Sequence, residues 1–174
     1  MKKLIILLLF IIVGFAKEVY FTPMEGKTAE KRLAYLFSHA HKEIKIVIYS
    51  FTNYVLARAL KKAAARGVKV YIIADKKSAR YKGSRIPNLA AIRNIHVRLL
   101  SGKKYKNGDE AKLHVKMSII DNKYLVTGSA NYSYSAFYKN YEYILIDTDK
   151  FLLKKFNDFF YLIYPLSTPY RLSR

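Results

Sequence analysis

A histidine, a lysine, an aspartate and an asparagine follow one another at short intervals in the second half of this chain. The segment 114–131 reads HVKMSIIDNKYLVTGSAN, so His114 lies two residues before Lys116, and Gly128-Ser129 lies shortly before Asn131. A neutral imidazole can attack phosphorus through a ring nitrogen, and an ammonium can neutralise a non-bridging phosphate oxygen. These residue types therefore indicate chemistry on a phosphate ester.

The segment 113–120 has the alternation of a strand with two different faces. Successive side chains of a strand point to opposite sides of a sheet. The apolar set, which we expect in the core, is Leu113, Val115, Met117 and Ile119, and the polar set is His114, Lys116 and Ser118. This strand would hold the imidazole and the ammonium side by side at a functional surface.

Residues after this strand can complete a phosphate-binding site. Gly128 permits close approach of the backbone, Ser129 can add a hydroxyl and an N–H, and the Asn131 amide can donate to the same oxygens. Glu142 lies two residues after Asn140, so both side chains can face one side of a later strand. We expect these groups to cradle a phosphate together with the lysine.

The residue types and spacing resemble the HxKxxxxD...GSxN signature of the phospholipase D superfamily, whose members cleave phosphodiesters through a covalent phosphohistidine. The chain is similar to the small bacterial endonucleases of that superfamily, which carry one signature each. The resemblance implies that Glu142 orients a catalytic histidine and that Asp121 supports the site from behind it. An isolated H-x-K is usually a solvated strand face, but agreement at the downstream positions favours an active site.

Strand-like and helix-like segments alternate along the chain. Predicted strands lie at 19–22, 43–50, 68–74, 96–100, 113–120, 124–127 and 141–147, and predicted helices at 28–40, between Asn53 and Gly67, at 88–94 and at 150–164. The continuous apolar run at 68–74 is typical of a strand buried on both faces. We predict one α/β sandwich with a central mixed β-sheet flanked by helices on both faces.

The charge of the chain points to a polyanionic partner. Among its 174 residues, 32 Lys and Arg oppose 12 Asp and Glu, a formal net charge of +20. This excess is far beyond what solubility needs, and nucleic acid and anionic lipid both suit it. The length suits a single domain, which we place at 17–164, followed by a loose C-terminal tail at 165–174.

The first 16 residues have the pattern of an export signal. Lys2-Lys3 precedes an apolar run, and Gly14-Phe15-Ala16 places small residues where a signal peptidase requires them. The run is short for a membrane span. We therefore expect a cleaved signal peptide and a periplasmic or envelope-associated protein, with a retained N-terminal anchor as the alternative and the only expected membrane contact.

No metal site or cofactor is predicted. The chain has no cysteine, which excludes disulfides and cysteine zinc sites. His39 and His41 lack a nearby third ligand, and Asp109-Glu110 is typical of a solvated loop because two-metal catalysis needs several convergent carboxylates.

A single signature implies a site shared by two chains. Displacing an alkoxide from phosphorus requires a nucleophile and a general acid. His114 cannot serve as both in one step, and the chain has no second matching motif. We therefore predict a two-fold homodimer in which the partner supplies the second histidine.

Two basic segments, 76–85 and 101–112, are predicted to be loops that track a phosphate backbone without reading sequence. Their expected nucleic-acid-binding residues are Lys76, Lys77, Arg80, Lys82, Arg85, Lys103, Lys104 and Lys106. Tyrosines interleaved with or near these segments could stack on unpaired bases, and they are Tyr81, Tyr105, Tyr132, Tyr134 and Tyr138.

The function expected from these patterns is that of an exported, metal-independent, sequence-nonspecific endonuclease. DNA, preferably single-stranded, is the expected substrate, and RNA is a second candidate. One alternative is a membrane-tethered phospholipase D that acts on lipid headgroups. The other is a non-catalytic envelope DNA-binding protein, against which the intact signature argues.

Overall fold

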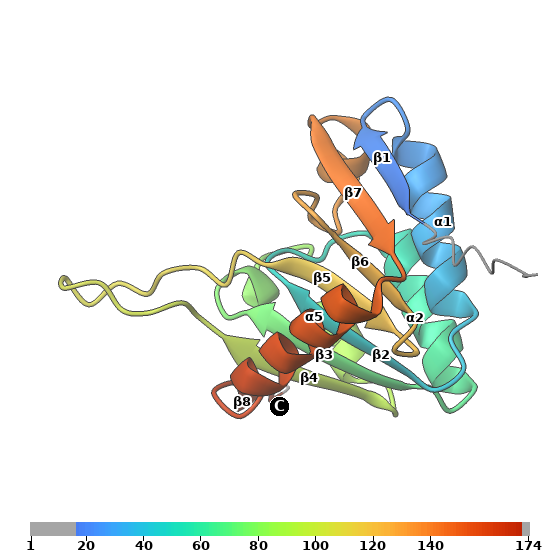
Figure 1. The fold of residues 1–174 in the computed structure, drawn as a ribbon. Helices are drawn as coiled ribbons and strands as arrows, with labels where there is room; N and C mark the ends of the chain where they lie inside the picture. Colours follow the sequence, from blue (N-terminus) through green and yellow to red (C-terminus); the bar gives the residue numbers. More distant parts are fainter. Residues whose placement is uncertain (1–16, 172–174) are drawn as a thin grey trace, which may run out of the picture.

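The computed structural model describes residues 17–171, which form a central sheet between two layers of helices (Figure 1). The strands are β1 (Glu18–Thr22), β2 (Glu43–Ile48), β3 (Lys69–Asp75), β4 (Ile95–Leu100), β5 (Lys116–Ile120), β6 (Tyr124–Gly128), β7 (Glu142–Asp147) and β8 (Thr168–Pro169). The helices are α1 (Gly26–Ser38), α2 (Tyr54–Ala65), α3 (Ile86–Ala90), α4 (Tyr134–Tyr138) and α5 (Lys150–Ile163), with a 3₁₀ turn at Ser78–Arg80. The predicted α/β sandwich is confirmed.

The sheet has eight strands in the order β1-β7-β6-β5-β2-β3-β4-β8. β2, β3 and β4 are parallel, with Ile46 opposite Ile72 and Ile72 opposite Val97, and the other pairings are antiparallel. The sheet is therefore mixed, as predicted. Its parallel part is built from β-α-β connections, and their apolar strands lie in the middle of the sheet, where both faces are covered.

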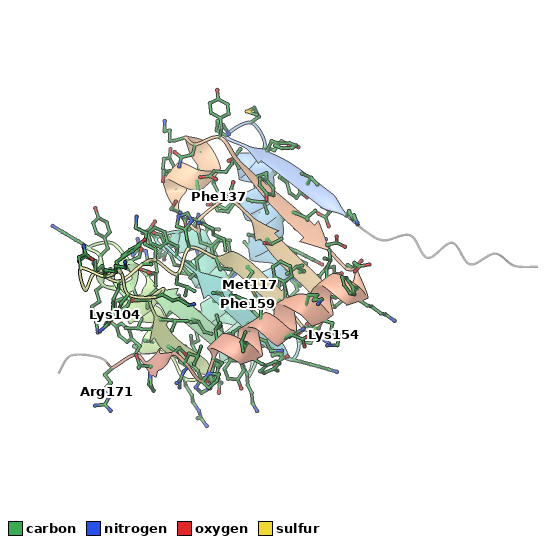
Figure 2. All side chains as sticks on the ribbon, turned by 60° about the vertical axis from the view of Figure 1, so that its left-hand side comes forward. Lys104, Met117, Phe137, Lys154, Phe159 and Arg171 are labelled. Carbon is green, nitrogen blue, oxygen red and sulfur yellow. The ribbon has the colours of Figure 1, made fainter. Side chains whose placement is uncertain are left out.

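Helices cover the two faces unequally. α1 and α2 pack on one face around the larger hydrophobic cluster, which includes Leu33, Leu60 and Ile72. α5 lies across the other face over a smaller cluster that contains Met117 of β5 and against which Phe159 of α5 packs (Figure 2). The predicted apolar set is thus confirmed, because Leu113, Val115, Met117 and Ile119 all belong to the α5 side. Ser118, expected at the functional surface, is instead fully buried, with its hydroxyl 2.6 Å from that of Tyr132.

The first helix begins earlier than predicted. It starts at Gly26, and Thr28, expected as its cap, lies in the first turn. A Cβ atom at position 26 would lie 1.6 Å from the carbonyl oxygen of Phe137, so only glycine lets this helix approach α4 so closely. The cap predicted for α2 is confirmed, since Asn53 Oδ1 accepts the N–H of Leu56 at 2.9 Å.

Three other boundaries differ from the sequence pattern. α3 spans only Ile86–Ala90, where a helix at 88–94 was expected. β5 begins at Lys116, so 113–115 precede the paired strand. The tail expected to be loose is attached to the sheet, because β8 pairs with β4 and Arg98 Nε donates to Ser167 Oγ at 2.7 Å.

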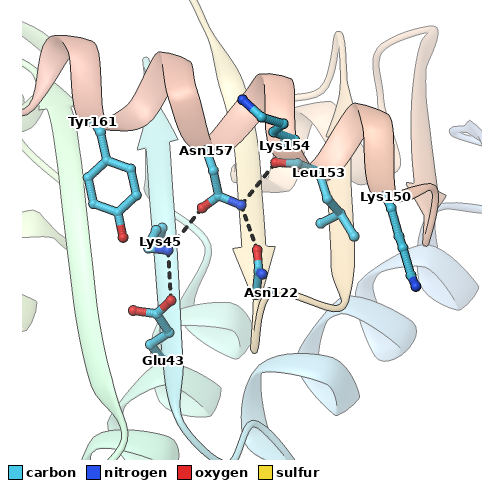
Figure 3. Close-up of a pocket in the computed structure, with 8 residues that line it drawn as sticks. All are labelled: Glu43, Lys45, Asn122, Lys150, Leu153, Lys154, Asn157 and Tyr161. Carbon is cyan, nitrogen blue, oxygen red and sulfur yellow. Dashed lines mark hydrogen bonds and ion pairs between the residues drawn. The ribbon is translucent and has the colours of Figure 1, made fainter.

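A polar cluster fixes α5 to the far end of the sheet (Figure 3). The buried Lys45 ammonium donates to Glu43 at 2.7 Å and to Asn157 Oδ1 at 2.9 Å. The Asn157 amide donates in turn to Asn122 Oδ1 at 2.6 Å. These groups line a hollow of about 550 Å³ beside α5. Their mutual hydrogen bonds indicate a structural role, since buried charges must be paired.

Residues 1–16, the predicted export signal, lie outside the described residues. Within 17–171, no helix has the length and apolar character needed to cross a bilayer.

Candidate active site

The loops that follow β2, β3 and β4 meet at one edge of the sheet, because parallel strands end at the same edge. β5 is antiparallel to β2 and begins there, with Lys116 opposite Ile48. The N–H of Tyr49 donates to the carbonyl oxygen of Val115 at 3.1 Å, which fixes the residues just before β5. His114 therefore lies at the same edge as the two basic segments, as predicted.

His114 and Lys116 form the central contact of this edge. The ammonium nitrogen lies 2.8 Å from Nδ1 and 3.1 Å from Nε2 of the imidazole, and it donates to the His114 carbonyl oxygen at 2.7 Å. The ring of Tyr49 packs against the imidazole, with centroids 4.9 Å apart. Lys116 is buried whereas His114 is exposed, so the imidazole stands at the surface above a buried cation.

This environment lowers the pKa of His114. The largest cause is its partial removal from water, followed by the positive charges of Lys116 and Lys112. The carboxylates of Asp75 and Glu142 oppose the shift. Because these causes disfavour the imidazolium, the ring is neutral near pH 7 and keeps a lone pair for attack. Burial also lowers the pKa of Lys116, and Glu142 opposes that shift.

The turn after β6 brings a side-chain amide to the site. Gly128 has a φ of +153°, and a Cβ atom there would lie 2.2 Å from the Tyr143 carbonyl oxygen. Glycine thus lets β6 and β7 close together, so the close approach at this residue is to the neighbouring strand. Oδ1 of Asn131 accepts the N–H of Ser50 at 3.3 Å, and its NH₂ group can donate to a phosphate oxygen.

Ser129 is used differently from the prediction. Its N–H donates to the Tyr143 carbonyl oxygen at 3.2 Å, and its Oγ accepts the N–H of Tyr143 at 3.1 Å. The expected contribution of its N–H to the phosphate is therefore wrong, because β7 takes that donor. The hydroxyl proton is the group that Ser129 can still offer to a ligand.

Glu142 begins β7 at this edge and is half-buried. Its negative charge acts on both His114 and Lys116. Among the described residues, no donor is hydrogen-bonded to its carboxylate. The placement fits the implied role of orienting a histidine, although that histidine is not hydrogen-bonded to it within one chain.

Asp121 lies away from this site, at the opposite end of β5. Its carboxylate accepts the backbone N–H groups of His41, Lys42 and Glu43 at 2.8, 2.8 and 3.1 Å. It thereby holds the start of β2 against the β5–β6 turn. The role implied for Asp121, to support the site from behind it, is not exerted through contact with the catalytic residues, because a strand of this length separates the two ends by about 15 Å.

The two basic segments differ in structure. Segment 101–112 forms a narrow antiparallel arm that projects from the body between β4 and β5 (Figure 1), and Lys104 lies on it opposite Glu110 (Figure 2). Hydrogen bonds from Gly102 N to Ala111 O and from Ala111 N to Lys103 O close it at 2.7 and 3.0 Å. We call this segment the basic arm. Three of the predicted binding residues are exposed on it, namely Lys103, Lys104 and Lys106.

The predicted binding residues of 76–85 divide into free and engaged side chains. Lys77, Arg80 and Lys82 are exposed. Lys76 pairs with Glu110 at the base of the arm at 3.1 Å. The guanidinium of Arg85 donates to the Thr52 carbonyl oxygen at 3.3 Å and lies over the Tyr54 ring. These last two cations help to shape the edge.

The tyrosines considered for base stacking differ in their exposure. Tyr81, Tyr105 and Tyr134 are 71, 62 and 62% exposed and are available for stacking. Tyr132 is buried with its hydroxyl 2.6 Å from Ser118 Oγ, and the Tyr138 hydroxyl donates to Glu30 at 2.7 Å. Tyr132 is therefore a core residue, and the stacking role considered for it is wrong.

Three residues near the histidine were not assigned a role from the sequence. Tyr49 and Lys112 lie beside the imidazole, with the Lys112 ammonium 5.6 Å from the Tyr49 ring centre. The buried Asp75 accepts the N–H of Leu113 at 3.0 Å and the N–H of Ser78 at 2.9 Å, which joins the two basic segments beside His114. A carboxylate at the end of an apolar parallel strand was the signal available for Asp75.

No group of three or more His, Cys, Asp or Glu side chains able to hold a metal is found in the part of the chain that the structure describes. His39 is an exposed residue whose ring stacks on Tyr35.

Comparison with known proteins agrees with this fold. Residues 33–163 match the family model described as "Cardiolipin synthase, PLD-like domain". Because the match covers well over half of the chain, the chain belongs to this family of phospholipase D-like domains. The predicted membership of the phospholipase D superfamily, a superfamily of phosphodiester-cleaving enzymes, is confirmed.

The chain is similar to named proteins in both sequence and fold. The chain is similar to the mitochondrial cardiolipin hydrolase of Danio rerio (25% identity, 84% of this chain and 62% of the relative) and to a phospholipase D of Rickettsia conorii (30%, 78% and 63%). It therefore spans about 60% of the length of these relatives. Its fold is similar to NucT from Helicobacter pylori (36% identity, TM-score 0.87, 90% of this chain and 100% of that one). It is also similar to Nuc, a phospholipase D family member from Salmonella typhimurium (25%, 0.75, 91% and 100%).

The lowered pKa of His114 predicts how the rate depends on pH. The acid limb of kcat/KM reports protonation of the free nucleophile, so it should lie below the ordinary imidazole value of 6.5. Lys112→Gln removes a cation that lowers this pKa, and the limb should therefore move to higher pH. Lys123→Gln, an exposed lysine in the turn at the opposite end of β5, is the matched control and should leave the limb in place. An unchanged limb in Lys112→Gln would contradict the electrostatic description.

Proposed function

We propose that this protein is an exported, metal-independent phosphodiesterase that cleaves nucleic acid through a phosphohistidine at a site shared by two chains. The observation that carries the proposal is the contact of 2.8 Å between a buried ammonium and an exposed imidazole of lowered pKa. The ammonium supplies the fixed positive charge that a metal would otherwise provide. The imidazole supplies a neutral nucleophile that faces solvent.

In the first step, a ring nitrogen of His114 attacks phosphorus, the N–P bond forms and the P–O bond to the leaving group breaks. The leaving oxygen takes a proton from the partner's His114. That imidazole must enter this step as the imidazolium, the form that the negative charges of the bound phosphate and of Glu142 favour. Lys116 and the Asn131 amide neutralise the non-bridging oxygens. The phosphate thus remains on one histidine, and one end of the cut strand leaves as an alcohol.

In the second step, the partner's His114, now neutral, takes a proton from water. The water oxygen bonds to phosphorus while the N–P bond breaks. Both histidines return to their starting protonation states. The net reaction converts a phosphodiester and water into a phosphomonoester and an alcohol.

Two features support sharing of the site between two chains. The exposed imidazole lies on the same edge as the Glu142 carboxylate, to which no donor in 17–171 is hydrogen-bonded. A two-fold axis beside them would bring the two imidazoles together and each carboxylate toward the partner's histidine. Exposed apolar side chains lie near that edge on the sheet face that α5 leaves open. They are Phe21 (55% exposed) and Tyr143 (46%), which are opposite one another in the register, with Met24 (69%) close by in sequence.

Nucleic acid is the substrate that the charge distribution favours. The basic arm and the 76–85 loop flank His114 from one side with exposed cations, and three exposed tyrosines lie among or near them. Such an edge suits a flexible polyanion bound mainly through its phosphates, with bases stacked on aromatic rings. Single-stranded DNA fits this description best, and RNA shares the same chemistry.

A lipid substrate is the second candidate, favoured by the exposed apolar residues Phe21, Met24 and Tyr143 at the catalytic edge. The relatives named cardiolipin hydrolase and phospholipase D also favour a lipid substrate. A non-catalytic DNA-binding protein is the third candidate function.

A substrate panel in excess EDTA tests the proposal. Labelled single-stranded DNA should be cleaved, and His114→Ala should lower kcat by roughly 10⁴-fold because the nucleophile is lost. His39→Ala, which removes an exposed histidine elsewhere, is the matched control. Activity that chelation abolishes and magnesium restores would overturn the mechanism. Hydrolysis of cardiolipin or phosphatidylcholine vesicles without DNA cleavage would support a lipid substrate. DNA binding without hydrolysis would support a non-catalytic DNA-binding protein.

Isolated mixed dimers test the sharing of the site. A dimer of one wild-type chain and one His114→Ala chain, purified through two different tags, should retain only a few per cent of wild-type activity, because each turnover needs both histidines. A mixed dimer with His39→Ala should remain fully active. Half-activity in the His114→Ala mixed dimer would show that each chain works alone.

The basic arm should act on binding and not on chemistry. Replacing Lys103, Lys104 and Lys106 by Gln should reduce the slope of log affinity against log salt by about 2 for single strands. KM for DNA should rise, while kcat on bis-p-nitrophenyl phosphate should stay nearly constant. The same loss of charge at exposed helix positions Lys31, Lys62 and Lys155 is the control. An equal change of slope in both triple variants would show that the arm has no special role.

A further inference from the structure

The buried carboxylate of Asp147, at the end of β7, has an oxygen without a hydrogen-bond donor. The side chain is 1% exposed, and Oδ1 accepts the N–H of Asp149 at 2.9 Å. Oδ2 accepts no hydrogen bond from the described residues. The Lys17 ammonium lies 3.7 Å from it, on a side chain that is 57% exposed. A buried carboxylate oxygen that lacks a donor is costly, so the site can accommodate a further donor.

The backbone of Lys17 lies beside this carboxylate. In the pairing of β1 with β7, Glu18 is opposite Ile146 and Val19 is opposite Leu145. Continuing this register by one residue places Lys17 opposite Asp147. Opposed residues in an antiparallel pair have Cα atoms about 4.5–5.5 Å apart. The main-chain nitrogen of Lys17 is therefore within reach of the Asp147 side chain.

Lys17 is also the residue that follows the predicted signal peptide. Gly14 and Ala16 are the small residues that a signal peptidase requires before the bond it cuts. That bond joins Ala16 to Lys17. The residue whose backbone lies beside the unpaired oxygen is thus the residue that would acquire a new charged terminus.

We propose that signal peptidase cleavage creates the missing partner of Asp147. Water hydrolyses the Ala16–Lys17 peptide bond, which leaves a carboxylate on Ala16 and an α-ammonium on Lys17. The new ammonium then donates to Oδ2 of Asp147 and fixes the edge strand β1 onto β7. This inference rests on the export part of the proposed function and is independent of the hydrolytic activity.

The pairing has a consequence for the candidate active site. The other end of β1 places Thr22 opposite Glu142, and the Thr22 hydroxyl donates to the Ala136 carbonyl oxygen at 2.7 Å. Fixing β1 at Lys17 therefore stabilises the strand that carries Glu142. The folded domain gains its full stability only after the leader has been removed.

A double-mutant cycle on the processed protein tests the pairing. The full chain is expressed with its leader, and mass spectrometry of the exported protein should give Lys17 as the first residue. Inserting Ser-Gly between Ala16 and Lys17 keeps the cleavage sequence and the charge but moves the ammonium by about 7 Å. The insertion should raise the equilibrium constant for unfolding about tenfold in the wild type. In the Asp147→Asn background it should have almost no effect.

Lys17→Gln is the matched control for the side-chain ammonium. The insertion should still destabilise this variant about tenfold, because the α-ammonium is the partner under test. The proposal would be overturned if the insertion changed the unfolding equilibrium equally with and without Asp147, or if it had no effect in Lys17→Gln. A mature terminus other than Lys17 would also overturn it. None of these outcomes depends on cleavage of DNA or lipid.

A second measurement needs no substitution at Asp147. The α-amine of the processed wild type should react about tenfold more slowly with an acylating reagent at neutral pH than the α-amine of the insertion variant, because pairing disfavours the free amine. Peptide mapping by mass spectrometry separates this site from the lysine side chains. Equal rates would contradict the pairing even if Asp147→Asn failed to fold.

Discussion

A buried ammonium beneath an exposed imidazole is the interaction on which the candidate site depends. Lys116 lies on β5, between β2 and β6 in the middle of the sheet, so its charge cannot move far. That fixed charge disfavours protonation of His114, and in the proposed mechanism it also neutralises the oxygens of a phosphate. Preorganised charge of this kind requires no rearrangement during the reaction. The neighbouring strands are needed chiefly because they hold this pair in place.

The two ends of the sheet serve different purposes. At one end, the carboxyl ends of β3 and β4 carry loops with exposed cations. At the other end, polar side chains are satisfied within the protein: Asp121 accepts three backbone N–H groups, and Lys45 is paired with Glu43 and Asn157. The first end can bind a ligand because its polar groups retain hydrogen-bonding capacity, and the second end gives the sheet a rigid base.

Much of the architecture could be predicted because its signals are local. The alternation around His114 and Lys116 predicted which side chains enter the core, and the cap at Asn53 was correct. The start of α1 was missed because Gly26 is required by the close approach of Phe137, a residue distant in sequence. The attached tail was missed for the same reason, since Arg98 of β4 holds it.

The sequence by itself determined the chemical groups of the site. It also determined that His114 and Lys116 lie on one strand segment and share a face, because a period of two residues fixes which side chains share a face. Only the tertiary structure decided how Asp121 and Ser129 are used: both occur in the signature, but the backbone groups of β2 and β7 occupy them. It also revealed Asp75, Tyr49 and the projecting basic arm. Such roles depend on which segments meet across the sheet, and spacing along one segment carries no information about the donors of another.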